Sequence, residues 1–226
     1  MRRLLPYLER LWATDVALTA LLVCLVTYVF ILHPLAPAGS LRFLAAVFFS
    51  LILISGAITA SRNRFFRIVV FSWSVLTFVA LWVAYLFPSA VLVLADLCLA
   101  LAFLVLLLVL IVRQVFREGR PTSHRIMGAV AVYLLLGLTW SLIYHAIALQ
   151  IPDAFKGLEN LTEGDNELHR LHFQYFSFTV LTTLGFGDIV PVNPIAQMSA
   201  VFEGIVGQLF PAILIARLVS LQLQSK

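Results

Sequence analysis

Long apolar runs separated by short polar breaks dominate the chain. Before residue 150 there are five such runs. Each reaches roughly 20 residues, the length that a helix needs to cross a bilayer core about 30 Å thick. They cover residues 11–32, 41–60, 66–87, 89–112 and 127–149. A sixth run extends over residues 194–223. The pattern predicts an all-α membrane protein with six transmembrane helices.

The segment between the last two runs breaks this pattern. Residues 150–171 are polar and acidic, which predicts an outer loop. Residues 172–183, HFQYFSFTVLTT, are apolar but too few to cross a bilayer, and they favour a re-entrant helix. Residues 183–188, TLGFGD, contain two glycines and predict an extended segment at membrane depth. Such backbone is tolerated only where protein buries it or water lines it.

Composition and charge extend this interpretation. Hydrophobic residues make up 62% of the 226 residues, and charged residues only 12%, which excludes an ordinary soluble domain. If the N-terminus is cytoplasmic, the loops place 12 of the 15 Lys and Arg residues on the inner face. This bias predicts a multi-pass protein of the plasma or cell inner membrane, with both termini in the cytoplasm. A cytoplasmic linker, residues 113–126, would separate a four-helix membrane domain, residues 1–112, from a second domain, residues 127–226.

The extended segment offers a particular chemistry. Four copies around an axis could present rings of carbonyl oxygens that replace the water shell of a cation, and the hydroxyl of Thr183 would add a further ring. Gly185 and Gly187 suit this arrangement, because glycine adopts dihedral angles that residues with a Cβ resist. Leu184 and Phe186 would then point away from the axis.

Residues Thr183 to Asp188 closely resemble the selectivity filter of potassium channels, whose usual sequence is Thr-Val-Gly-Tyr-Gly-Asp. Leu184 replaces valine and Phe186 replaces tyrosine, so the hydroxyl that can brace the filter is missing. The resemblance implies a homotetramer in membrane lipid that conducts K⁺ passively. It implies no enzymatic activity, no organic cofactor and no nucleic acid. The K⁺ ions would be coordinated by Thr183, Leu184, Gly185 and Phe186, within a filter that extends to Gly187.

The residues around the filter fit the same resemblance. Asp188 would lie at the outer mouth of the pore. Thr179 takes a position where some members of the family place an acid behind the filter. The expected supports on the pore helix are Tyr175, Phe176, Thr179 and Thr182.

On the last run, Gly207 falls where many members of the family have a hinge glycine. Gln208, Pro211 and Ile215 share one helix face, which would line the cavity below the filter or, alternatively, pack against the fifth span. Pro211 is expected to kink the helix.

Glu203, Asp96 and His145 are ionisable residues within predicted spans, where each carries a functional hypothesis. Glu203 could brace the pore helix, and Asp96 could pair with Arg42. For His145, near an outer helix end, interfacial solvation is the favoured interpretation.

The fourth run distinguishes this chain from voltage-gated relatives with the same six-span layout. Residues 90–112 contain no Lys or Arg, so the sequence predicts a channel that is not voltage-gated. The alternatives are a carrier-type potassium uptake subunit, a non-conducting or modulatory membrane subunit, and a non-selective cation channel. The complete filter and the single pore loop argue against the carrier and the non-selective channel.

Overall fold

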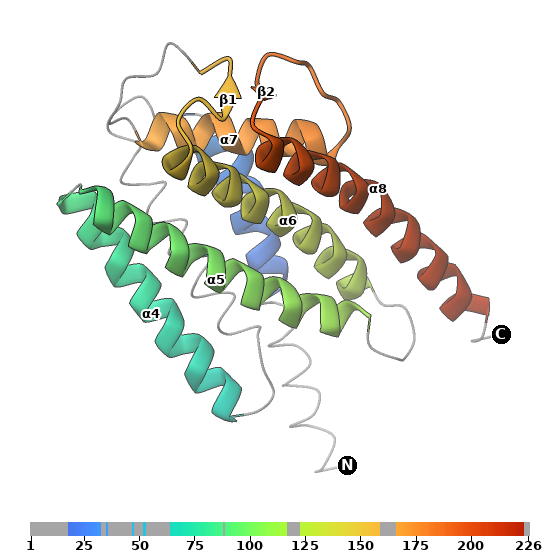
Figure 1. Cartoon of the computed structure of the whole chain (residues 1–226). Helices are drawn as coiled ribbons and strands as arrows, with labels where there is room; N and C mark the ends of the chain where they lie inside the picture. Colours follow the sequence, from blue (N-terminus) through green and yellow to red (C-terminus); the bar gives the residue numbers. More distant parts are fainter. Residues whose placement is uncertain are drawn as a thin grey trace. The chain divides into compact units, whose positions relative to one another are not determined.

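The structure is a computed structural model, and it describes residues 18–32, 35, 47, 52, 64–87, 89–116, 123–158 and 166–223. These residues are mostly helical (Figure 1). The chain forms two compact units, Met1–Leu134 and Leu135–Lys226. The long helix α6, Ser123–Gln150, contributes to both.

The first unit contains two helices that pack against each other, α4 (Arg64–Leu86) and α5 (Ala90–Val115). Ser89 caps the start of α5, since its hydroxyl oxygen accepts the backbone N–H of Leu92 at 3.3 Å. The indole N–H of Trp73 on α4 donates to the carbonyl of Leu99 on α5 at 3.4 Å. An apolar helix over Leu18–Leu32 ends in a π-helical turn, η1 (Tyr28–Leu32).

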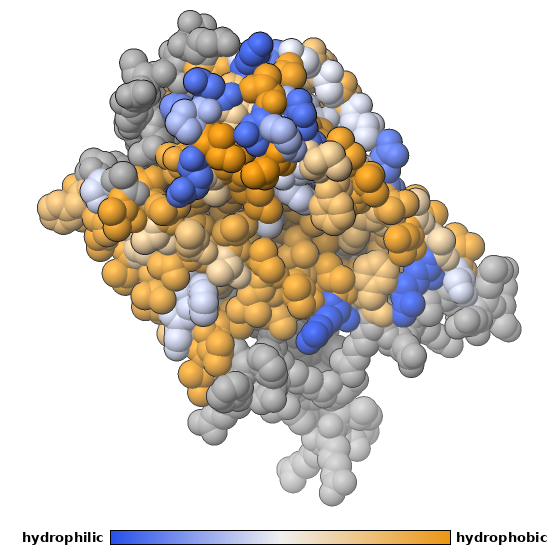
Figure 2. Space-filling model, in the orientation of Figure 1, coloured by the Kyte–Doolittle hydropathy of each residue, from blue (hydrophilic) through white to orange (hydrophobic). Residues whose placement is uncertain are grey.

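Three of the described helices are long and apolar enough to cross a membrane: Val91–Arg113, Ile126–Gln150 and Pro194–Ser220. The apolar helices Leu18–Leu32 and Ile68–Ala84 are shorter. The expected span at 41–60 lies almost wholly outside the described residues. Figure 2 shows that hydrophobic residues cover most of the described surface in this view. The chain is therefore an integral membrane protein, and the count of six spans stays a prediction.

The second unit consists of the C-terminal part of α6, the shorter helix α7 (Asn166–Leu181) and the long helix α8 (Pro194–Leu223) (Figure 1). Helix α7 packs against α8. Asn193 caps α8, since its side-chain oxygen accepts the N–H of Ile195 at 2.9 Å. Pro194 takes the first helical position, where the missing N–H costs nothing.

The expected bounds of the pore helix, residues 172–183, differ from those of α7. The helix begins at Asn166 and ends at Leu181. Leu168 and Leu171 continue the helical spacing of apolar positions toward the N-terminus, although polar residues interrupt the run. At 1.5 Å per residue, α7 is about 24 Å long, which is still shorter than a bilayer core.

A small sheet, which the all-α interpretation did not include, joins the outer loop to the segment before α8. Strand β1 (Phe155–Lys156) pairs antiparallel with β2 (Val190–Pro191), which follows the filter sequence. The carbonyl of Ala154 also accepts the N–H of Val192 at 2.9 Å. These bonds fasten the outer loop to the segment between α7 and α8.

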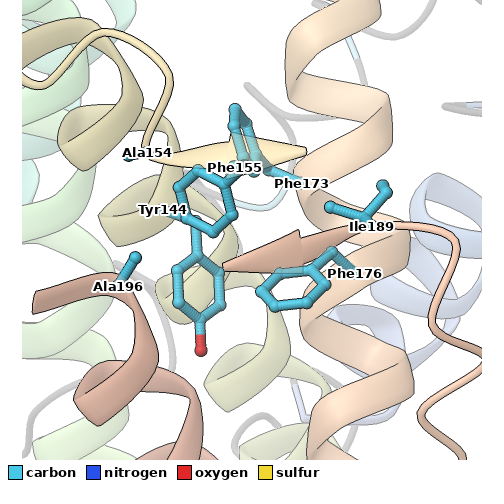
Figure 3. Packing of buried hydrophobic residues seen from close by; sticks show 7 residues of the cluster. All are labelled: Tyr144, Ala154, Phe155, Phe173, Phe176, Ile189 and Ala196. Carbon is cyan, nitrogen blue, oxygen red and sulfur yellow. The ribbon is translucent and has the colours of Figure 1, made fainter. Parts of the chain in front are cut away.

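A cluster of buried side chains holds this unit together beneath the sheet (Figure 3). Tyr144 of α6 and Phe173 of α7 are completely buried in it. The ring of Phe155, from β1, lies 5.0 Å from that of Phe173 and 5.8 Å from that of Tyr144, both edge to face. The cluster therefore joins α6, α7 and β1. Its members are Tyr144, Ala154, Phe155, Phe173, Phe176, Ile189 and Ala196.

Candidate functional site

The segment that follows α7 has an alternating backbone. Thr183, Gly185 and Gly187 have positive φ angles of 61°, 54° and 81°, whereas Leu184 and Phe186 between them do not. Positive φ is common for glycine but unusual for threonine. In a β-strand successive carbonyls point to opposite sides, whereas alternation of this kind turns successive peptide groups toward one side.

The beginning of this segment is bound to the end of α7. The carbonyl oxygen of Thr179 accepts the N–H of Leu184 at 2.8 Å and that of Gly185 at 3.3 Å. The side chain of Thr179 points elsewhere, since its hydroxyl donates to the carbonyl of Phe176 at 2.8 Å. The hydroxyl of Thr182 donates to the carbonyl of Phe178 at 2.6 Å. Thr179 thus contacts the segment through its backbone and not through its side chain.

At the other end of the segment, α7 contributes an aromatic side chain. The ring of Tyr175 stacks on Phe186, with ring centroids 6.4 Å apart and planes 4° from parallel. The hydroxyl of Tyr175 donates to the carboxylate of Asp188, and this hydrogen bond raises the pKa of Tyr175. Phe186 has no hydroxyl of its own, so Tyr175 supplies the polar contact at this end of the segment.

Gly157 in the outer loop lies directly against Asp188. A Cβ added to Gly157 would stand 1.9 Å from the carbonyl oxygen of Asp188, and its φ of 91° also favours glycine. Gly157 directly follows strand β1 in the sequence, and Asp188 comes two residues before strand β2. The outer loop therefore approaches the backbone of the segment as closely as a residue without a side chain allows.

Behind the segment, α7 is held by both long helices of the second unit. The hydroxyl of Ser177 lies 2.8 Å from the carbonyl oxygen of Gly137 on α6 and 2.6 Å from Oε1 of Glu203 on α8. Gly137 leaves room for Phe178, because a Cβ there would be 2.6 Å from its ring. Glu203 therefore contacts α7, the helix expected to be the pore helix, as hypothesised from the sequence.

Gly207 permits a close approach between helices. A Cβ at this position would lie 2.1 Å from the carbonyl oxygen of Leu181, the last residue of α7. Helix α8 continues through both Gly207 and Pro211. The structure thus gives Gly207 a packing role, and its role as a hinge stays a prediction.

The side chains expected to line a cavity are not packed inside the described part of the chain. Gln208 and Ile215 are exposed, and Pro211 is half-buried. The exposed fraction of Ile215 reaches 61%. Whether this face lines a cavity or packs against the fifth span stays a prediction.

The interpretation of His145 as a solvated residue is wrong, because the side chain is only 2% exposed. Its ring stacks on Phe173, with centroids 5.9 Å apart, and on His169 at 6.4 Å. Helix α7 begins earlier than expected and so places His169 beside His145. Asp96 is also buried, while its suggested partner Arg42 lies outside the described residues.

Sequence reasoning missed several residues that shape this region, namely Gly137, Tyr144 and Gly157. Their contacts join residues far apart in the chain. The sequence shows where the glycines are, but their neighbouring residues do not indicate which distant part of the chain each glycine approaches.

Residues 132–223 match the model of a family described as "Ion channel". No curated protein matches the chain significantly. The match covers α7, the segment after it, α8 and most of α6. The match supports an ion-channel domain in these residues, and ion channels transport ions passively across a membrane and are not enzymes.

Proposed function

We propose that this protein is a potassium-selective channel that conducts K⁺ passively as a homotetramer and is not voltage-gated. The observation that carries the proposal is the alternating backbone of Thr183, Gly185 and Gly187. Carbonyl groups turned to one side can replace the hydration shell of K⁺. Residues Thr183 to Phe186 would coordinate the ions, within a filter ending at Gly187, and Asp188 would attract cations at the outer mouth. No organic cofactor or nucleic acid is needed.

The contacts around the segment support this assignment. A filter must keep its oxygens in place while ions pass, and here the carbonyl of Thr179 holds the beginning while Tyr175 holds the end. Phe176 supports α7 from within the buried cluster, and Thr182 closes its last turn. Both ends of the proposed filter are therefore fixed by α7.

Exposure of the segment supports assembly. One segment supplies only a quarter of a coordination cage, so a closed ring needs four copies around an axis. In the single chain, Leu184 and Phe186 are 62% and 66% exposed. Such apolar surface is expected to be covered by neighbouring subunits and lipid. On α8 the exposed apolar residues include Ile195, Met198, Val201, Phe202, Ile205, Leu209, Ile213, Ile215 and Val219.

Single-channel recording of the purified protein in planar bilayers tests the proposal against its alternatives. A channel gives unitary currents that far exceed the turnover of a carrier cycle. A modulatory subunit gives no current when it is the only protein present. Unitary potassium currents from the protein alone would support the proposal, and their absence from a correctly assembled preparation would refute it.

The variant Gly185→Ala tests the role of the backbone. An added Cβ at Gly185 meets no atom within 4 Å in the chain, so the change leaves packing intact. The φ angle of 54° is strained for alanine, at a cost of roughly 1–2 kcal/mol per subunit. Native mass spectrometry should still find four chains, while conduction is lost. As a matched control, Leu184→Val restores the usual residue of the family and should conduct. Full conduction by Gly185→Ala would contradict the assignment.

A further inference from the structure

A set of hydrogen-bonded oxygen atoms joins all three helices of the second unit around Glu203. The carboxyl group of Glu203, on α8, is completely buried. Its Oε2 lies 2.5 Å from the hydroxyl of Tyr144 on α6, and its Oε1 lies 2.6 Å from the hydroxyl of Ser177 on α7. The same hydroxyl of Ser177 lies 2.8 Å from the carbonyl oxygen of Gly137 on α6.

The surroundings of this carboxyl group are apolar and uncharged. The ring of Tyr144 packs edge to face against Phe176 at 4.9 Å and stacks on Trp140 at 6.0 Å. Trp140 in turn contacts Phe202, next to Glu203, at 5.8 Å. Within the described residues, Tyr144 is the one titratable side chain that contacts Glu203, and no Lys, Arg or His forms an ion pair with it. A buried carboxylate without a cation is costly.

The hydrogen atoms available to this set can be counted. The three contacts are Tyr144 to Glu203, Glu203 to Ser177, and Ser177 to Gly137. Each contact brings two oxygen atoms within hydrogen-bond distance and needs one hydrogen. The hydroxyls of Tyr144 and Ser177 supply one hydrogen each, and a carbonyl supplies none. If Glu203 is ionised, one of the three contacts has no hydrogen atom. If Glu203 is protonated, each of the three contacts has one.

We propose that Glu203 is a neutral carboxylic acid that donates from Oε1 to Ser177 and accepts from Tyr144 at Oε2. Ser177 is then free to donate to the carbonyl of Gly137. Glu203 is thereby a positioning residue that holds α7 between α6 and α8. This role rests on the proposed channel function, because α7 also holds the filter through the carbonyl of Thr179.

Infrared spectroscopy detects the proton directly. The purified protein at neutral pH should show the C=O stretching band of a protonated carboxylic acid, and Glu203→Gln should lack that band. In Ser177→Ala the acceptor is gone, so the band should move to higher frequency. Identical spectra for the unaltered protein and Glu203→Gln in this region would overturn the proposal. The measurement is independent of whether the protein conducts potassium, so it separates this inference from the proposed function.

Potassium flux into liposomes tests the positioning role. Glutamine can donate through its amide N–H₂ to Ser177 and accept from Tyr144, so Glu203→Gln should keep the flux within about twofold of the unaltered protein. Glu203→Leu is similar in volume but leaves the hydroxyl of Tyr144 without its acceptor and that of Ser177 with Gly137 alone, and the flux should fall about tenfold or more. Loss of flux in Glu203→Gln, in a tetramer that assembles, would contradict the role, as would full flux in Glu203→Leu.

Discussion

At the scale of single residues, Tyr175 connects α7 with the C-terminal end of the proposed filter. Its ring stacks on Phe186 and its hydroxyl donates to Asp188. The side chain is partly exposed, so this hydrogen bond is worth only about 1 kcal/mol. It is nevertheless a polar contact at the end of the segment where Phe186 has no hydroxyl to offer. Tyr175 is therefore expected to determine how long the filter stays conductive.

The variant Tyr175→Phe removes the hydroxyl and keeps the stacked ring. Potassium current during maintained recording should decline about fivefold faster, the ratio that corresponds to about 1 kcal/mol. Because Asp188 raises the pKa of Tyr175, the bond is fully present below the ordinary tyrosine pKa of about 10 and is lost as pH rises through the raised value. The unaltered channel should therefore lose sustained current in strongly alkaline solution, and Tyr175→Phe should show no such change. Equal decline in both proteins would contradict this role.

The sequence indicated some residue roles and not others, for physical reasons. The proposed filter was visible because its pattern is local: a threonine and two glycines in five consecutive residues. Glu203 was visible as an ionisable residue in an apolar run, but its partners were not, because Tyr144 and Ser177 belong to other helices. His145 was misjudged because the rings beside it, those of Phe173 and His169, belong to another helix, and His169 had been assigned to the loop.

At the scale of helices and strands, close contacts at glycines decide how α7 and α8 meet. A side chain at Gly207 would collide with the backbone of Leu181, which cannot move aside as the end of a flexible side chain can. Gly204, one turn earlier, has only the carbonyl of Val180 in reach, at 3.9 Å from an added Cβ. The two glycines therefore differ in what a methyl group would cost.

Gly207→Ala should separate α8 from the end of α7 and destabilise the protein by roughly 1–3 kcal/mol, the usual cost of overpacking. Gly204→Ala is the matched control, with an ordinary contact distance and the better helix propensity of alanine, so its stability should be unchanged or slightly higher. Thermal unfolding of the purified protein in detergent compares the two variants. Unfolding of both variants at the same temperature would contradict the packing role of Gly207.

The elements themselves were predictable to different degrees. Helix α8 begins at an Asn-Pro pair, which is a local signal for a helix start, and its apolar run is continuous. Helix α7 begins among polar residues, so its first turns were assigned to the loop. Strands β1 and β2 are two residues each and pair across a long stretch of sequence, so no periodicity could reveal them.

At the scale of the whole molecule, the charge distribution bears on gating. One charge moving across the membrane field is worth about 2.3 kcal/mol per 100 mV, so steep voltage dependence needs several mobile charges. Helix α5 covers the fourth predicted span and has Arg113 only in its last turn. Asp96 is the only acidic residue in that span. The expected result is a conductance that depends little on membrane potential.

A tail-current activation curve in symmetrical potassium measures this dependence. The slope should correspond to less than about one gating charge per subunit, the contribution of a single acidic residue. Asp96→Asn is the control, since it removes the only charge of the fourth span. A steep curve that persists in Asp96→Asn would show that the charges of voltage gating lie elsewhere in the chain.

Residues 183–187 are expected to select potassium, and the reversal potential measures that selectivity. The purified protein is placed in a planar bilayer with potassium on one side and sodium on the other, with the concentrations equal. Four copies of the alternating segment should admit K⁺ and exclude Na⁺. The current should therefore reverse far from zero, in the direction set by potassium permeability. A reversal potential near zero would mean that sodium passes equally well, and it would contradict the account.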